Sequence, residues 1–468
     1  MKTILQNLML ILILVMAQRV TGQISNTLSP SDKIYGLSRF WQEVNYNFVY
    51  LEQFGREKWD SAYRSAIPVV LDTKNDYQYY RELQKFCALL KDGHTNVLSP
   101  FDESNSNFGE YRICLGNFSN RAIVVGVNLS KKDEIPIGSE VTEVNGMAVP
   151  DYISQHVAPF ISASTGYILE DLSIERLLRG IDGEKYDIKI KTPAGKVISL
   201  SLTHAKTTEK EIYPSLPRPG LFDFKWYDDH IAYVALNSFA NPKVDTLFVE
   251  QLPALQKAKG IIIDLRNNGG GSSFVGDYIF KHLTNDKLIY GAKGSTRYHN
   301  AAFKAWGGLF QPKDTSTGNA ARGLSKEKVL TYYKASRDKL YYDLEYAPDT
   351  NDPAISKLTV PLVILIGHNT ASAAEDFLIA AKGQKHMIKI GENSFGSTGQ
   401  PYEFRLPGGG RARVCTLKVT CPDGSRFVGC GIKPDIEVKM SVEDYLQQKD
   451  PVLEKGIAYL KSIISPMN

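Results

Sequence analysis

The most informative pattern of hydrophobic and polar positions lies in residues 359–383, TVPLVILIGHNTASAAEDFLIAAKG. An aliphatic run over residues 360–366 gives way to a polar turn, and small apolar residues at helical spacing follow, which predicts a strand, a tight turn and a helix. Ser372 falls in the first turn of that helix, where free backbone N–H groups and the helix dipole favour an oxyanion. Ser372 is therefore a candidate nucleophile. A helix capped by Thr370, with Ser372 as one more polar residue, would explain the same pattern.

Strands and helices alternate through residues 220–445. The segments HIAYVALNSF, VDTLFVEQLPALQKA, KGIIIDLRNNGGG and SSFVGDYIFKHL precede the 359–383 stretch, and this order predicts βαβ units with a parallel sheet. A polar insertion at about 285–357 is too long for a plain connection, and we expect it to form a lid or a groove wall. Residues 446–468 are expected to end the chain with a helix. The predicted fold class is α/β, within an α+β multidomain chain.

Two further domains are predicted ahead of this core. Aromatic residues at helical spacing indicate an N-terminal helical domain over residues 29–112. Within it, the segment KDGHTNV ends a helix and leaves His94 in the following loop or strand. A lone His is more often a packed residue than a catalyst. Residues 113–206 contain short β runs bounded by turn residues, which predicts a β-rich domain.

Residues 1–22 have the pattern of a secretory signal peptide. A lysine is followed by an apolar run at residues 8–17 and then by Val20-Thr21-Gly22, so cleavage is expected before Gln23. The apolar run is too short to span a bilayer, and no later segment is long and apolar enough to do so. We therefore predict an exported protein, periplasmic or extracellular, without a membrane span.

Composition excludes several classes of partner. The 468 residues are 43% hydrophobic and 23% charged with a net charge of +4, and there is neither a basic stripe nor a Walker loop. Nucleic acid and nucleotides are therefore not expected as partners. The five cysteines form no C-x-x-C motif and accompany no His pair, so we predict neither a metal nor a cofactor. A disulfide among Cys415, Cys421 and Cys430 stays open, as does the oligomeric state.

Three glycines, Gly269-Gly270-Gly271, directly follow the strand and turn DLRNN. Glycine is needed where backbone N–H groups must approach a ligand closely without a Cβ in the way, as in an oxyanion hole. A structural turn would need only one of them. The glycines are therefore candidate oxyanion donors.

The motifs DLRNNGGG, TASAAEDF, FGSTGQP and GIKPDIEV occur in that order, behind DGHT and a PDZ-like segment, IPIGSEVTEVNGMAV. In this arrangement the chain resembles the tail-specific, C-terminal processing serine peptidases over nearly all of its mature length. The resemblance implies a ClpP/crotonase-like core, an acyl-enzyme mechanism and polypeptide substrates. It also implies that Ser372 is the nucleophile and that Ala373 and either Gly269 or Gly270 donate to the oxyanion. The PDZ-like domain implies capture of a free chain terminus.

One position departs from that family. Members with a Ser-Lys dyad carry Lys where this chain has Ser397. His94 in DGHT resembles instead the His of the tricorn-like branch, so we expect His94 to act as the general base. The residue that orients His94 is not identified, with Asp92 and Glu375 as candidates. Glu375 is equally explained as an acid that is favourable near a helix N-terminus.

The sequence thus predicts an exported serine endopeptidase that cuts unstructured or C-terminal polypeptide segments through an acyl-enzyme at Ser372. Two alternatives stay open. One is a non-catalytic protein that binds peptides or other ligands on the same fold, and the other is a hydrolase of a non-peptide substrate.

Overall fold

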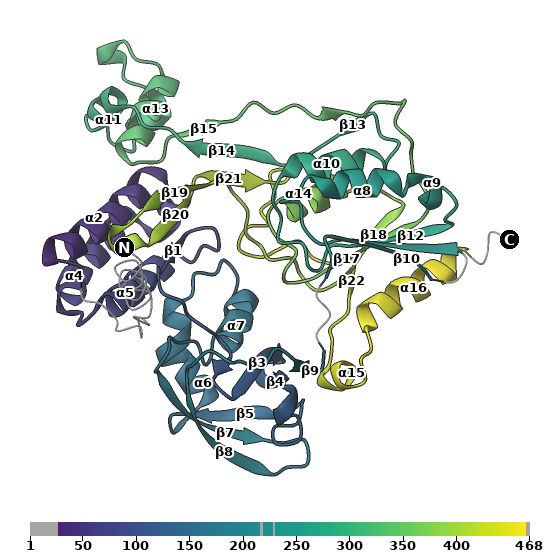
Figure 1. Ribbon diagram of the computed structural model, residues 1–468. Helices are drawn as coiled ribbons and strands as arrows, with labels where there is room; N and C mark the ends of the chain where they lie inside the picture. Colours follow the sequence, from purple (N-terminus) through teal and green to yellow (C-terminus); the bar gives the residue numbers. More distant parts are fainter. Residues whose placement is uncertain (1–26, 216–218, 228–229, 465–468) are drawn as a thin grey trace, which may run out of the picture.

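The computed structural model describes residues 27–215, 219–227 and 230–464. The predicted signal peptide lies outside these ranges. Figure 1 shows N-terminal helices, a β-rich part below them, and a layered α/β part beside both. The chain is thus a mixed α/β multidomain protein, as predicted, whereas the proposed domain boundaries stay predictions.

A six-stranded sheet forms the centre of the α/β part, in the order β10-β11-β12-β17-β18-β22. Strand β10 is antiparallel to β11, and all other neighbours are parallel. Every residue of β11, β12 and β17 is buried, as expected for aliphatic strands covered on both faces. The strands span Phe222–Tyr227, Ile231–Leu236, Gly260–Asp264, Leu362–Ile366, Met387–Gly391 and Ile436–Glu437.

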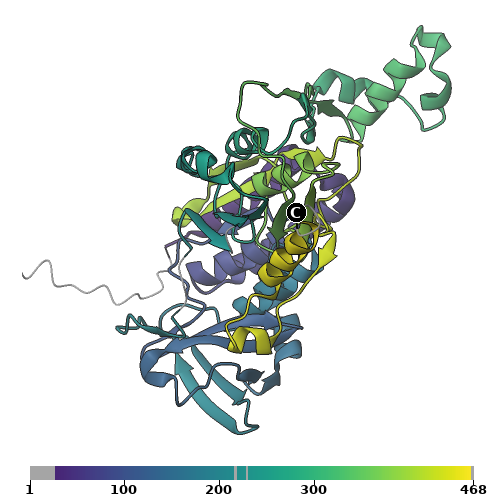
Figure 2. The ribbon, with the colours of Figure 1, turned by 90° about the vertical axis from the view of Figure 1, so that its right-hand side faces the viewer.

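Helices cover both faces of this sheet. Helices α8 (Lys243–Glu250), α10 (Ser273–Lys281) and α14 (Ala373–Ala380) pack on one face around a large apolar core. Helix α16 (Pro451–Ile464) packs on the other face (Figures 1 and 2). Because β12 and β17 are parallel neighbours, the glycine loop after β12 and the turn after β17 meet at the same sheet edge.

The N-terminal helices share their core with a distant part of the chain. They are α2 (Pro30–Asn47), α3 (Leu51–Phe54), α4 (Arg56–Asp72) and α5 (Asp76–Ala88). Phe404, Leu406 and Cys415 pack into that core from a later hairpin. The hairpin strands β19 (Pro401–Arg405) and β20 (Arg411–Cys415) form a sheet with β1 (Asn96–Leu98). This pairing brings the loop that contains His94, between α5 and β1, next to the segment that precedes β19.

The β-rich part is built on an eight-stranded sheet with its own core. Helix α7 (Gly166–Glu175) packs against β3 and also contributes to that core. The sheet strands β2 to β9 span Asn107–Phe108, Tyr111–Phe118, Arg121–Asn128, Glu140–Val144, Met147–Ala148, Lys185–Lys191, Val197–Thr203 and Ile212–Tyr213, and α6 with two short helical turns spans Val149–Tyr152, Ile153–Val157 and Ala158–Phe160. Its resemblance to a PDZ domain stays a prediction.

The insertion leaves the α/β part as an extended arm. Its helices α11 (Ala301–Gly307) and α13 (Lys326–Ser336) project away from the rest of the molecule (Figures 1 and 2). Its strands and remaining helix are β13, β14, α12, β15 and β16, spanning Leu288–Ile289, Lys293–Arg297, Asp314–Thr317, Tyr341–Asp343 and Asp349–Thr350. Strand β14 pairs with β21 (Leu417–Thr420), and α15 (Val442–Leu446) precedes α16.

Two general findings bear on the earlier predictions. All five cysteines are free thiols, so the structure contains no disulfide among Cys415, Cys421 and Cys430. Within the described ranges, no helix combines the length and apolar character that a membrane crossing needs.

Candidate active site

Ser372 occupies the sharp turn between β17 and α14, as the N-cap residue of the helix. Its backbone has φ 55° and ψ −121°, a conformation that a non-glycine residue adopts at a cost of about 1–3 kcal/mol. A strained strand-to-helix turn of this kind presents a nucleophile at the end of a sheet. Thr370 does not cap the helix: its hydroxyl donates to the Leu265 carbonyl and accepts from the Gly367 N–H.

The glycine loop lies directly against this turn. A Cβ added to Gly270 would lie 2.7 Å from the Ser372 Cβ and 2.9 Å from the Ala373 nitrogen, and Gly270 has φ 93°. Only glycine fits here, so the space beside the Ala373 N–H stays open. The Gly270 N–H itself donates to Asn268 Oδ1 at 2.9 Å. Gly269 is exposed, whereas the Gly270 N–H is already engaged, so Gly269 stays a predicted oxyanion donor.

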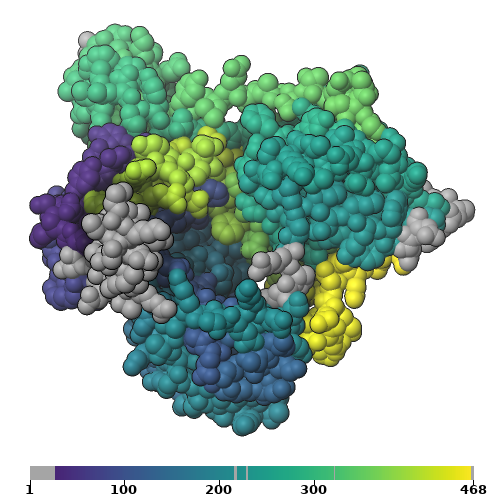
Figure 3. Space-filling model, in the orientation of Figure 1, coloured from purple at the N-terminus to yellow at the C-terminus, as the bar shows by residue number. Residues whose placement is uncertain are grey.

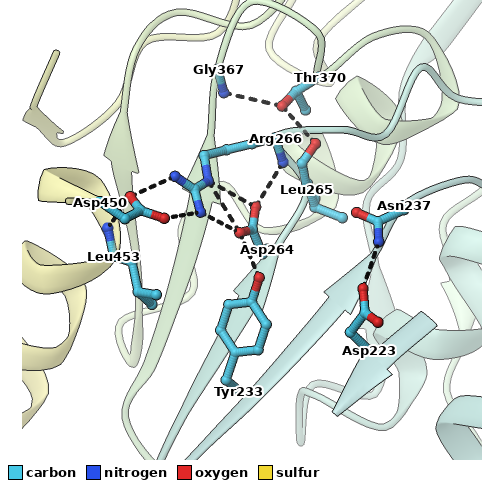
Figure 4. Close-up of polar contacts among 10 residues, drawn as sticks. All are labelled: Asp223, Tyr233, Asn237, Asp264, Leu265, Arg266, Gly367, Thr370, Asp450 and Leu453. Carbon is cyan, nitrogen blue, oxygen red and sulfur yellow. Dashed lines mark hydrogen bonds and ion pairs between the residues drawn. The ribbon is translucent and has the colours of Figure 1, made fainter. Parts of the chain in front are cut away.

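A polar cluster behind the loop holds it in place (Figure 4). Arg266 donates to both carboxylate oxygens of Asp264 and to both of Asp450, which precedes α16. Tyr233 also donates to Asp264 at 2.9 Å. This arrangement, buried at Asp264 and partly exposed at Asp450, fixes the DLRNN segment between the sheet and α16. Sequence reasoning weighed only the glycines of this motif and missed the role of its charged residues.

Asn268 connects the glycine loop to the nucleophile turn. Its carbonyl accepts from the Ala371 N–H at 3.0 Å, and its side-chain nitrogen donates to the Leu236 carbonyl at 2.8 Å. Because Asn268 is completely buried, both bonds are protected from water. The positions of Gly270 and Ser372 are thus coupled through one side chain and its backbone.

His94 lies in the loop between α5 and β1, and its Nδ1 is 2.8 Å from Ser397 Oγ. Ser397, in the position of the family's Lys, is buried and contacts the very His that was expected to replace that Lys. Burial, and secondarily the charge of Arg413, lowers the pKa of His94 to about 4. His94 is thus neutral at ordinary pH. No hydrogen bond joins His94 to Ser372 Oγ within the described part of the chain.

Glu375 joins the two halves of this arrangement. Its Oε2 accepts from the backbone N–H groups of both Ser372, at 3.1 Å, and Ser397, at 3.3 Å. Its Oε1 accepts from Ser394 Oγ and the Gly396 N–H. Complete burial raises the pKa of Glu375 to about 8, although these donors favour the carboxylate. Glu375 therefore positions the nucleophile turn and the Ser397 loop together, without touching the His94 ring.

Asp92, the other residue predicted to orient His94, instead forms hydrogen bonds that hold the loop around it. It is buried and accepts from the Thr95 hydroxyl at 2.6 Å and from Ser164 Oγ at 3.4 Å. The Gly93 N–H donates to the same Ser164 hydroxyl. These bonds fix the loop that carries His94. The ring itself is held by Ser397, which sequence reasoning had treated only as the absence of a base.

Helix α7 of the β-rich part reaches the nucleophile turn through two contacts. Asp171 binds Nδ1 of His368 at 2.5 Å, and Tyr167 stacks on the same imidazole at 4.6 Å. The Tyr167 hydroxyl also donates to the Ser394 carbonyl at 2.6 Å. Burial opposes the charged form of His368, but its pKa is raised overall by the carboxylates of Asp171 and Glu392. The β-rich part thus touches both segments that build the site.

Comparison with known proteins agrees with this geometry. The sequence profile of peptidase family S41 matches residues 230–438, which include the glycine loop and Ser372. Residues 230–438 thus match peptidase family S41. Together with the relatives described next, this match identifies the chain as a serine-type peptidase. His94 lies outside the matched segment.

Similar proteins match this chain over most of their length. The carboxyl-terminal-processing protease of a Picosynechococcus species is 22% identical over 444 residues, which is 92% of this chain and 87% of that protein. The corresponding protease of a Synechocystis species is 21% identical over 438 residues, 92% of this chain and 86% of that protein. The structure of mature CPAF complexed with lactacystin has a TM-score of 0.65 at 16% identity and covers 94% of this chain and 98% of CPAF. That likeness shows the shared fold.

The described residues offer no metal site. No group of three or more His, Cys, Asp or Glu side chains in the described ranges is arranged to hold a metal ion.

Proposed function

We propose that this chain is an exported endopeptidase that hydrolyses unstructured polypeptide through an acyl-enzyme at Ser372. The observation that carries the proposal is the strained N-cap position of Ser372 against Gly270 and the open Ala373 N–H. Export rests on the sequence pattern of residues 1–22, and a periplasmic or extracellular location follows from it.

His94 serves as the general base. With Nδ1–H donating to Ser397 Oγ, the other ring nitrogen, Nε2, has its lone pair available for the Ser372 proton. Catalytic hydrogen bonds often tighten only when substrate is bound, so Ser372 and His94 must approach each other in the substrate complex. Glu375 accepts hydrogen bonds from the backbone of both Ser372 and Ser397, and so holds the two segments in fixed relative positions for that approach.

The reaction proceeds in two halves. Ser372 Oγ attacks the scissile carbonyl carbon while its proton passes to His94, and the Ala373 and Gly269 N–H groups stabilise the oxyanion. The C–N bond then breaks, the proton goes from His94 to the leaving amine, and the acyl group stays on Oγ. Water attacks the acyl-enzyme in the same way, which releases the carboxylic product and restores Ser372.

The substrate is an extended polypeptide. The names of the relatives describe carboxyl-terminal processing, and the contacts between α7 and the catalytic segments provide a route by which the β-rich part could report a bound chain end. The His368–Asp171 contact and the Tyr167–Ser394 hydrogen bond link the two parts beside Ser372.

The proposal is tested by incubating the purified mature chain with a quenched-fluorescent unstructured peptide, a folded protein and a simple carboxylic ester. The peptide should be hydrolysed by the wild type and left intact by Ser372→Ala, while the folded protein resists both. Hydrolysis of the ester alone would instead support a hydrolase of non-peptide substrates. No turnover of any of them, with binding of the peptide, would support a binding protein.

A further inference from the structure

A large cavity lies between the N-terminal helices and the β-rich part. Its volume is about 1110 Å³, and its walls come from α5, from the helical turns after α6 and from the end of α7. Figure 3 shows a hollow between the β-rich part and the yellow-green β19–β20 hairpin, and Arg413 of that hairpin lines the cavity. At its inner end the cavity reaches Gly93 and Phe395, which flank the His94–Ser397 contact. The cavity wall therefore adjoins the loops that carry His94 and Ser397.

Five basic and five acidic side chains line the cavity, but they are not paired one to one. Asp72 pairs with Lys74, and Asp102 contacts a lysine outside the cavity. Glu103 is fully engaged, because one oxygen accepts from Arg179 and the other from Tyr77. The remaining acids are Glu82 and Glu184, and Glu184 is a half-buried carboxyl group that accepts a backbone N–H.

Three arginines of the lining form no ion pair with any carboxylate of the described chain: Arg81, Arg176 and Arg413. Arg81 donates to Gln84 and stacks on Phe160 at 3.9 Å. Arg413 donates from two nitrogens to the neutral Asn96 Oδ1. Carboxylates lie near them, Glu184 near Arg81 and Asp92 near Arg413, but none forms a close ion pair with these guanidinium groups.

Arg176 is the most unusual of the three. Its Nε is buried without a hydrogen-bond partner among the described residues. Burial lowers the pKa of Arg176, and the nearby carboxylates of Glu175 and Glu103 offset this only in part. A buried charged donor that lacks a partner is costly in a folded protein, and such groups persist where a ligand supplies the missing contact.

We propose that this cavity binds a carboxylate of the polypeptide substrate through Arg176 and Arg81. Planar guanidinium groups bind carboxylates in a bidentate manner, and the two residues approach the cavity from opposite walls. The carboxylate belongs either to an acidic side chain or to the chain terminus. Because the cavity leads to the His94 loop, the bound carboxylate anchors the substrate on the side of the base. The inference rests on the proposed peptidase function.

Four fluorescein-labelled peptides of one unstructured sequence test this site. The peptide contains Glu residues or their Gln replacements, and each form ends in a free carboxylate or an amide. Binding is measured by anisotropy on the full mature chain carrying Ser372→Ala, so that no turnover is needed. Arg176→Gln and Arg81→Gln are added separately to this background. Arg121→Gln is the matched control, because Arg121 lies on the same β-rich part and pairs with Glu140 away from the cavity.

Each cavity variant should weaken binding of the carboxylate-bearing peptide about tenfold or more, the effect expected of a charge-assisted hydrogen bond, whereas Arg121→Gln has no effect. Arg176→Lys should recover part of the loss. If amidation abolishes the difference between wild type and variant, the ligand is the chain terminus; if the Gln peptide abolishes it, the ligand is an acidic side chain. Equal losses for all four peptides, or no loss for any, would overturn the inference.

The same data separate this inference from the proposed function. If the chain with Ser372 intact binds the peptides through Arg176 but never cleaves them, the cavity site is supported and the peptidase function is refuted. If peptide cleavage and binding are unchanged by substitution of Arg176 and Arg81, the peptidase function is supported and the cavity site is refuted. Thermal melting of each variant checks that it folds, and Arg81, on the half-exposed face of α5, remains informative if Arg176→Gln does not.

Discussion

Replacing Ser397 with Ala removes the one side chain that hydrogen-bonds to the His94 ring within the described ranges. The Nδ1 to Oγ distance is 2.8 Å, and Ser397 is completely buried, so water cannot easily take its place. A buried donor left without its partner costs about 1–3 kcal/mol. If the loss raises the free energy of the productive ring orientation by that amount, kcat should fall by roughly five- to 150-fold. KM should change little, because Ser397 does not face the substrate.

Steady-state hydrolysis of a quenched-fluorescent peptide gives kcat and KM for this comparison. The sharper readout is a double-mutant cycle with His94→Ala. Once His94 is absent, Ser397→Ala should cost almost nothing more, since its effect passes through the ring. Ser425→Ala, which removes an exposed hydroxyl bonded to Asp423, is the control for the loss of a serine. A normal kcat in Ser397→Ala, or equal losses with and without His94, would refute the positioning role.

Three further outcomes follow from the contacts. His94→Ala should lower kcat by several orders of magnitude, and because the base must be neutral, wild-type kcat/KM should rise with pH through about 4 and then stay level; a midpoint near 6.5 would argue against the buried ring. Asp450→Asn weakens the hydrogen bonds to Arg266 and should lower the free energy of unfolding by about 1–2 kcal/mol, measured as a lower midpoint of urea unfolding. An unchanged midpoint would contradict the stabilising role of Asp450. Protonated His368 pairs with Asp171, which stabilises the folded state below pH 6.5, and this stability is lost as the pH rises through the raised pKa of His368. The melting temperature of the wild type should therefore fall over that pH range, whereas that of Asp171→Asn should not. The same pH dependence of the melting temperature in both proteins would contradict this.

Local sequence signals were sufficient for the frame of the site. The aliphatic run, the turn and the small-residue helix around Ser372 are encoded within residues 359–383, and the glycine loop that follows β12 is encoded in the DLRNNGGG motif. Periodicity also predicted the alternating strands and helices of the core. These features depend on neighbours along the chain, so they can be read from the order of residues alone.

The missing parts depend on contacts between distant segments. His94 and Ser397 are 303 residues apart, and their contact depends on β1 pairing with β20. No local sequence pattern predicts that pairing, so Ser397 was interpreted only as the residue that stands where the family has its catalytic Lys. The packing of Phe404 and Cys415 into the N-terminal helical core has the same origin. The Arg266 ion pairs were similarly hidden, since Asp450 is 184 residues away.

The central claim is that Ser372 is the nucleophile, and covalent labelling tests it most directly. The mature chain is incubated with a fluorophosphonate, digested, and mapped by mass spectrometry. The account predicts one adduct, on Ser372, which disappears in Ser372→Ala and forms far more slowly in His94→Ala. An adduct on another residue such as Ser397, or peptide hydrolysis that persists in Ser372→Ala, would contradict it.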